Sequence, residues 1–205
     1  MGRPCLIIVC GVPGSGKSTF ALHVADRWGG LRFASETFAE ELGAAARTTS
    51  GDLSKEAIAH AYSAMAAAVR ASLATDKMVV AVGSFRSEEQ RKRFRDIATS
   101  SGASVMTLRI VCPIETAAIR VSSRRALGER GPSETAISQI DAELNRARDI
   151  DIALTNASSV DHFHRRADAV IEVLELDWDH DASTTAIKQR LEKLAIDKIA
   201  LTRNS

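Results

Sequence analysis

One short run of residues near the start of the chain has the types and the spacing that bind nucleotide phosphates. The run reads Gly11-Val12-Pro13-Gly14-Ser15-Gly16-Lys17-Ser18-Thr19, and its first eight residues match the pattern G-x-x-x-x-G-K-[ST]. Glycines let the backbone curl tightly, so that successive N–H groups point inward at phosphate oxygens. The Lys17 ammonium would reach the β- and γ-phosphates, and the Ser18 hydroxyl would be a ligand of Mg²⁺.

The segments on either side of this phosphate-binding loop (P-loop) are the ones that its chemistry needs. Residues 5–10 form a continuous apolar, β-rich run, which predicts a buried strand. Residues 18–28 are typical of a helix that ends at Gly29-Gly30. A helix N-terminus behind the loop adds partial positive charge. A glycine loop that only turned the chain would leave Lys17 and Ser18 unexplained.

Short apolar runs alternate with helical stretches along the rest of the chain. Further strands are predicted at 31–34, 78–82, 104–111 and 151–155. Helices are predicted at 36–46, 54–75, 88–100, 114–125, 134–150 and 159–176. This alternation predicts an α/β fold with a parallel sheet covered by helices on both faces. Ligands of such sheets bind at the carboxyl ends of the strands.

Composition and charge exclude several classes of protein. The chain has 205 residues, of which 45% are apolar and 26% charged, so disorder over most of its length is excluded. The net charge of +1 gives no global basic field for wrapping a nucleic-acid duplex. Three cysteines without a CxxC pair argue against a disulfide framework and fit a reducing cytoplasm. The early apolar run is too short for a membrane span.

The chain is predicted to divide into one domain over residues 1–176 and a short C-terminal appendage over residues 177–205. Within the appendage, 183–201 carries Ile187, Leu191 and Leu194 along one helical stripe. That helix would pack on the domain or on a second subunit, which would make a homodimer. The acidic run at 177–181 is interpreted as a linker rather than a metal cluster.

Residues 5–175 resemble a family of small P-loop kinases. The resemblance rests on residues 6–22, 35–36, 79–85, 114–125 and 133–149 in this order and spacing. The family includes bacterial polynucleotide 5′-kinase domains, zeta-toxin-like kinases, gluconate kinase and chloramphenicol phosphotransferase. It implies a three-layer sandwich around a five-stranded parallel sheet of order 2-3-1-4-5, with a short lid.

The resemblance also implies a general base. In the family a Ser-Asp pair follows the second strand, and its carboxylate accepts the proton of the acceptor hydroxyl. Ser35 and Glu36 are the matching residues here, and Glu36 keeps the carboxylate. The alternative is that Glu36 only favours a helix start through the helix dipole. The family also has an arginine a few residues after this pair. The corresponding position in this chain is near Ala39, which is not basic.

Two arginines match those that flank the lid in the family. Arg120 and Arg124 are four residues apart, so they share one face of a helix. Such arginines neutralise the charge that spreads over the equatorial oxygens during phosphoryl transfer. The alternative is a solvated basic face of the helix. The stretch 125–132 would move as the lid and exclude water.

The end of the third predicted strand departs from the family pattern. The family has an aspartate that helps to hold Mg²⁺, whereas Val82-Gly83-Ser84-Phe85 stands here. Mg²⁺ keeps several waters and needs few protein ligands, so the loss weakens catalysis without necessarily abolishing it. Ser84, Glu36 and Glu88 are the candidates to compensate.

Weaker signals lie elsewhere in the chain. Arg86 follows the third strand at the ligand edge, where it would contact acceptor or phosphate. The next predicted helix carries Arg91, Lys92, Arg93 and Arg95, which we expect to face solvent. His162 and His164 would diverge on a helix, which argues against a metal site. Cys112 is interpreted as a structural thiol.

These features support one leading hypothesis and two alternatives. The first is an ATP- and Mg²⁺-dependent kinase that transfers the γ-phosphate to a hydroxyl of a small molecule, with a polynucleotide 5′-hydroxyl as second acceptor. The second is a nucleotide-binding regulatory or partner-binding module with little turnover, and the third is a simple NTPase. The predicted catalytic residues are Lys17, Glu36, Arg120 and Arg124. The predicted nucleotide-binding residues are Gly11, Pro13, Gly14, Ser15, Gly16, Lys17, Ser18 and Thr19, with Ser18 as the metal ligand.

Overall fold

The structure, a computed structural model, describes residues 4–43, 48, 52–75, 78–129, 131–157 and 159–178. The predicted tail helix at 183–201 and the acidic run from 179 onward lie outside the described residues. The last described helix runs to Trp178. The division of the chain at residue 176, the homodimer and the cytoplasmic location stay predictions.

Five parallel strands form the sheet, and they lie at the predicted positions. They are β1 (Cys5–Cys10), β2 (Leu31–Ala34), β3 (Met78–Val82), β4 (Ser104–Val111) and β5 (Ile152–Thr155). Their order is β2-β3-β1-β4-β5 and every neighbouring pair is parallel, which confirms the order that the resemblance implies. In the central strand, Val9 is in register with Val82 on one side and Leu108 on the other.

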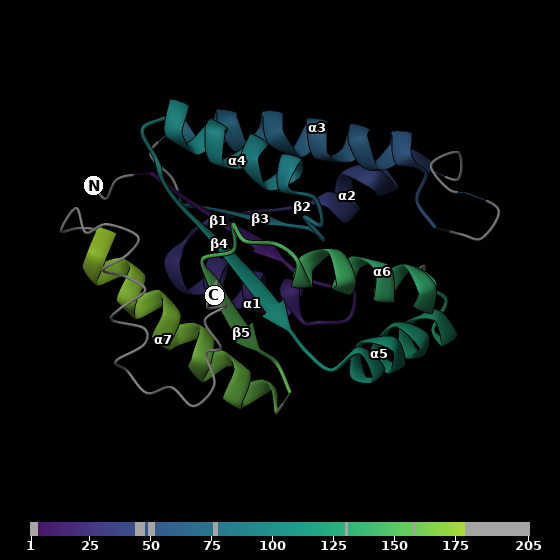
Figure 1. The fold of residues 1–205 in the computed structure, drawn as a ribbon. Helices are drawn as coiled ribbons and strands as arrows, with labels where there is room; N and C mark the ends of the chain where they lie inside the picture. The colour runs from purple at the N-terminus through teal and green to yellow at the C-terminus, as the bar shows by residue number, and fades with distance from the viewer. Residues whose placement is uncertain are drawn as a thin grey trace.

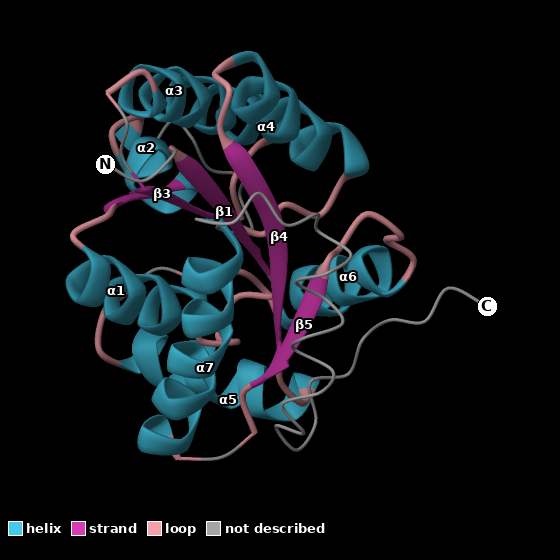
Figure 2. Ribbon diagram, turned by 90° about the vertical axis from the view of Figure 1, so that its left-hand side faces the viewer, coloured by secondary structure: helices cyan, strands magenta, loops and turns pink. Residues whose placement is uncertain are grey.

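Helices cover both faces of this sheet and its carboxyl edge. They are α1 (Lys17–Trp28), α2 (Ser35–Glu40), α3 (Lys55–Leu73), α4 (Glu88–Ser100), α5 (Ile114–Ala126), α6 (Glu134–Asn145) and α7 (Val160–Trp178). One face is covered by α3 and α4 and the other by α1 and α7, while α5 and α6 lie beyond the carboxyl ends of the strands (Figure 1). Figure 2 shows the same layers from the side. The fold is the predicted α/β three-layer sandwich.

Two apolar cores explain why the central strand is apolar at every position. Leu6 and Ile8 point to the core beneath α3 and α4, where Met65 is fully buried. Ile7 and Val9 point to the opposite core, beneath α1 and α7. A strand buried on both faces has no solvent side, so the alternation of polar and apolar residues disappears.

Two helices end at least five residues before the position that the sequence predicts. Instead of reaching residue 46, α2 ends at Glu40, and Gly43 then turns the backbone with a φ of 66°. The predicted helix at 134–150 ends at Asn145 as α6. Four residues later, Asp149 forms an ion pair with Arg91, and this contact requires the chain to leave the helix. Among the helices of the described residues, none is both long and apolar enough to cross a lipid bilayer.

Candidate nucleotide site

The P-loop joins the end of β1 to the start of α1, and its shape depends on glycine. Gly14 and Gly16 have φ angles of 84° and 102°, which lie in the left-handed region that side chains rarely adopt. A Cβ on Gly14 would come to 2.5 Å from the carbonyl oxygen of Ala117 in α5. The P-loop therefore packs closely against α5 at Gly14, and this contact brings α5 close to the backbone of the loop.

Lys17 is a buried cation at the first position of α1. Its side chain is 7% exposed, and its Nζ donates a hydrogen bond to the carbonyl oxygen of Val12 at 2.8 Å. Burial lowers the pKa of the Lys17 ammonium below its ordinary value, and the nearby Glu36 carboxylate opposes part of that shift. An anion placed in the loop would supply the missing countercharge.

The donor groups of the loop fit a nucleotide with its metal. The Ser15 hydroxyl is fully buried and has no hydrogen-bond partner among the residues described, and it does not open into the cavity that Ser18 lines. Ser18 is exposed and lines the same cavity as Glu36, so that a hydroxyl and a carboxylate face one space. Mg²⁺ prefers such oxygen ligands and completes its shell with water.

One cavity of about 380 Å³ brings the predicted catalytic residues together. Its walls come from the P-loop, α1, α2, α5 and the start of α7, and they are formed by Gly14, Gly16, Lys17, Ser18, Thr19, Glu36, Arg120, Arg124, Asn156, Val160 and Phe163. All four predicted catalytic residues are in this set. Of the predicted nucleotide-binding residues, Gly11, Pro13 and Ser15 do not line the cavity. They shape the loop from behind, and their predicted contact with a nucleotide stays a prediction.

The two predicted arginines lie on one face of α5. Arg120 donates from Nη1 to the carbonyl oxygen of Gly14 at 3.2 Å, and Arg124 donates from Nε to the carbonyl oxygen of Arg120 at 3.4 Å. Within the described part of the chain, neither guanidinium forms an ion pair with a carboxylate. Both positive charges are therefore available to an anion in the cavity.

Glu36 occupies the first turn of α2, which follows β2 directly. Its side chain is exposed and lines the cavity. An acidic residue at this position also favours the helix start, because the N-terminus of a helix carries partial positive charge. The two roles are compatible, since a carboxylate on the first turn can serve the helix and face a substrate.

At the two positions where the sequence departs from the family pattern, 82 and 39, the side chains are apolar and buried. Val82 is 3% exposed and belongs to the core beneath α1 and α7. Ala39 is also 3% exposed, on the inner side of α2. Neither position offers a metal ligand or a cation, so the carboxylate and the arginine of the family have no replacement at these two sites.

A profile of a family of AAA domains, AAA_33, matches residues 6–150 of the sequence. The chain belongs to this family. A comparison with curated protein sequences finds no match.

Solved structures with the same fold are small P-loop kinases. A putative kinase from Chloroflexus aurantiacus J-10-fl is 18% identical, with a TM-score of 0.61 over 93% of this chain and 98% of that one. The APS kinase of Mycobacterium tuberculosis is 19% identical, with a TM-score of 0.59 over 85% and 99%. A gluconokinase from Sinorhizobium meliloti 1021 is 19% identical, with a TM-score of 0.57 over 95% and 99%. At this level of identity the likeness concerns the fold.

Sequence reasoning missed one polar residue of the site of this AAA domain. Asn156 follows β5 directly, is 6% exposed and lines the cavity. Its Nδ2 donates to the carbonyl oxygen of Ser15 at 2.8 Å, and its backbone N–H donates to Val111 at 2.7 Å. A Cβ on Gly16 would collide with this amide. The sequence signal for Asn156 was its place directly after the last strand, because the carboxyl ends of parallel strands bind ligands.

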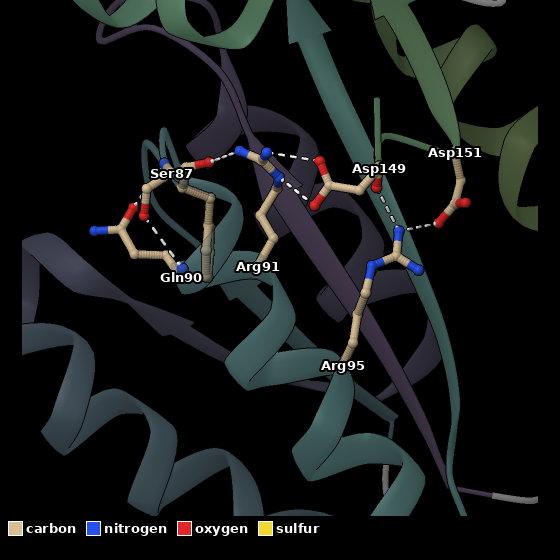
Figure 3. Close-up of polar contacts among 7 residues, drawn as sticks. Ser87, Gln90, Arg91, Arg95, Asp149 and Asp151 are labelled. Atoms are coloured by element: carbon tan, nitrogen blue, oxygen red, sulfur yellow. Dashed lines mark hydrogen bonds and ion pairs between the residues drawn. The ribbon is translucent and has the colours of Figure 1, made fainter. Parts of the chain in front are cut away.

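The expectation that the basic cluster on α4 faces solvent is wrong for two of its members. Arg91 is 2% exposed and donates to both carboxylate oxygens of Asp149, at 2.8 and 2.6 Å (Figure 3). Arg95 donates to the carbonyl oxygen of Asp149 at 2.5 Å and to the carboxylate of Asp151 at 2.8 Å. Their spacing of four puts both on the face that meets the segment after α6. Lys92 and Arg93 are exposed as expected.

Arg86, His162, His164 and Cys112 do not line the cavity. The Arg86 Nε lies 3.4 Å from a carboxylate oxygen of Glu143 in α6, and Arg86 does not line the cavity. His162 is exposed, whereas His164 stacks on His23 with 4.2 Å between ring centroids. Burial raises the pKa of the Cys112 thiol above its ordinary value, so this cysteine is not activated as a nucleophile.

Proposed function

We propose that this AAA domain is an ATP- and Mg²⁺-dependent phosphotransferase that moves the γ-phosphate to a hydroxyl of a small molecule. One observation carries the proposal. A single cavity gathers the P-loop lysine, the carboxylate of Glu36, and the guanidinium groups of Arg120 and Arg124, which have no carboxylate partner among the described residues. Phosphoryl transfer depends on positioning and on neutralisation of charge, and these residues supply both.

The chemistry follows from where each group lies. The N–H groups of the loop and Lys17 would bind the β- and γ-phosphates, and Ser18 would hold Mg²⁺, whose charge neutralises the phosphate oxygens. The oxygen of the acceptor hydroxyl would form a bond to the γ-phosphorus while the bond to the β-phosphate oxygen breaks and its electron pair leaves with ADP. Glu36 would accept the proton of the hydroxyl. Arg120 and Arg124 would stabilise charge on the transferring group.

The structural relatives support a small-molecule acceptor. They are described as a putative kinase, an APS kinase in complex with AMPPNP and APS, and a gluconokinase. The fold of this chain matches each of them over nearly their whole length. The second candidate is a nucleotide-binding module with little turnover, which is favoured by the apolar residues at positions 82 and 39, where the family has a carboxylate and an arginine.

Transfer of labelled γ-phosphate from ATP tests the proposal. The purified chain is incubated with Mg²⁺ and pooled nucleosides, sugars, aminoglycosides, cell metabolites and a 5′-hydroxyl oligonucleotide. We expect a labelled product that is absent with Lys17→Ala and present with Lys92→Ala, because Lys92 is exposed, pairs with Asp96 and does not line the cavity. Label found only as free phosphate would indicate an NTPase, and ATP binding without transfer would indicate the module.

A further inference from the structure

The hydroxyl of Tyr62 lies where three segments of the site meet. Tyr62 is the sole tyrosine of the chain and is 7% exposed within α3. Its hydroxyl oxygen accepts a hydrogen bond from the backbone N–H of Phe85, at 2.8 Å, and the hydroxyl of Ser35 lies on the same side of Gly83. Phe85 belongs to the turn after β3, and Ser35 is the first residue of α2.

The space around Gly83 shows how closely these groups converge. A Cβ on Gly83 would come to 2.6 Å from the Tyr62 hydroxyl oxygen and to 2.9 Å from the Ser35 hydroxyl oxygen. The backbone N–H of Gly83 donates to Val9 in β1 at 3.2 Å. The next residue, Ser84, accepts at 3.4 Å from the N–H of Gly11, the first residue of the P-loop. The turn thus lies between the P-loop and the two hydroxyl groups.

This turn is held in an unusual backbone conformation. Phe85 has a φ of 43°, the sole positive φ of a non-glycine residue among those described. A bulky residue keeps such an angle where its surroundings fix it on several sides. Tyr62 binds its N–H, and Arg91 donates from Nη1 to its carbonyl oxygen at 2.6 Å. Arg91 is fixed in turn by Asp149.

The second neighbour of the Tyr62 hydroxyl is the start of the helix that carries Glu36. This helix, α2, has six residues, and its N-cap Ala34 provides no side-chain hydrogen bond. A short helix without a cap depends on tertiary contacts for its position. The Ser35 hydroxyl, which converges with that of Tyr62 at Gly83, brings the first turn of α2 against α3, one residue before Glu36.

We infer that the Tyr62 hydroxyl is a positioning group, which fixes the first turn of α2, and with it Glu36, relative to the P-loop across the turn at 83–85. The inference rests on the proposed function, in which Glu36 is the base. Tyr62 acts through Ser35 and does not line the cavity. Burial raises the pKa of the Tyr62 hydroxyl to about 12, so it stays protonated.

Tyr62→Phe tests the inference, because it keeps the ring and removes the hydroxyl. We expect kcat for phosphate transfer to fall by about tenfold to a hundredfold, as small misplacements of a catalytic group do. KM for ATP should stay within about twofold, since the residues of the P-loop are untouched. Ser63→Ala is the matched control, as it removes an exposed hydroxyl from the next position of the same helix.

A double-mutant cycle separates positioning from general stability. Ser35→Ala breaks the same link from the other end, so it should lower kcat by a similar factor. The double variant should be no slower than the slower single variant, because the two changes remove one interaction. If the factors by which kcat falls in the two single variants multiply in the double variant, the inference is overturned. A lower unfolding temperature of Tyr62→Phe with unchanged kcat would also overturn it.

Hydrogen exchange gives a readout that needs no turnover. In Tyr62→Phe the amides of residues 83–87 and 35–40 should exchange faster, while the remaining amides of α3 keep their protection. Unchanged protection in both segments would overturn the inference. If the unmodified chain transfers no label, the proposed function fails instead, and exchange still decides whether Tyr62 couples the two segments.

Discussion

At the scale of single residues, Lys17 is the group whose surroundings say most about the ligand. Its ammonium is nearly buried, and its hydrogen bond goes to a neutral carbonyl oxygen rather than to a carboxylate. A buried ammonium without a bound counterion lowers the free energy of unfolding. A site that is stable without ligand would place a carboxylate against this lysine. In this site, the charge of Lys17 is left for a bound anion to neutralise.

The sign of the Lys17 pKa shift gives a pH-dependent prediction. Its pKa in the folded chain is below the ordinary 10.5, so between the two values the unfolded chain binds more protons. The free energy of unfolding should therefore rise with pH between the folded pKa and 10.5 in the original chain, relative to Lys17→Met. Urea unfolding of both proteins at a series of pH values measures the difference. A difference that stays constant up to pH 10.5, or falls, would contradict the burial of an ionised lysine.

At the scale of elements, the end of β5 and the P-loop are joined through Asn156, which lies 141 positions after Ser15. Its amide donates to the P-loop carbonyl of Ser15, while its backbone is fixed to Val111 at the end of β4. The loop is thus held from the sheet as well as from the helix behind it. The shape of the phosphate cradle depends on a residue outside the motif.

Asn156→Ala should weaken ATP binding by about tenfold with little change in kcat. The reason is that the Ser15 carbonyl loses its partner and the loop gains freedom, which costs about 1–3 kcal/mol for an unsatisfied buried group. Titration calorimetry with ATP and Mg²⁺ measures the affinity. Asn145→Ala is the control, because that amide binds Arg109 and does not line the cavity. Equal ATP affinity in both variants would show that Asn156 does not shape the loop.

The sequence predicts elements well where the determinants are local. The strand, loop and first helix of the site are fixed by signals within residues 5–30, and the capping box at Ser87 and Gln90 starts α4 where predicted. The end of α6 and the burial of Arg91 depend on Asp149, which is 58 positions from Arg91. Without a known partner, a charged side chain is predicted to face solvent. The contact between Arg91 and Asp149 could therefore not be predicted from the sequence.

At the scale of the whole molecule, the parallel topology assembles the site. Because all five strands run the same way, the P-loop, the Ser35-Glu36 pair and Asn156 follow carboxyl ends that meet at one edge of the sheet. This rule, together with the family resemblance, predicts which residues share the cavity. It does not predict Tyr62, whose role depends on where the middle of α3 crosses the end of β3.

The arrangement around the cavity makes Glu36 the most direct test of the whole account. The measurement is transfer of γ-phosphate to the acceptor by Glu36→Gln, with ATP affinity determined on the same protein and Lys17→Ala as reference. A general base contributes roughly 10²–10⁴-fold, so transfer should fall by at least about a hundredfold while ATP still binds. Transfer that is unchanged in Glu36→Gln yet lost in Lys17→Ala would contradict the assignment of Glu36 as the base.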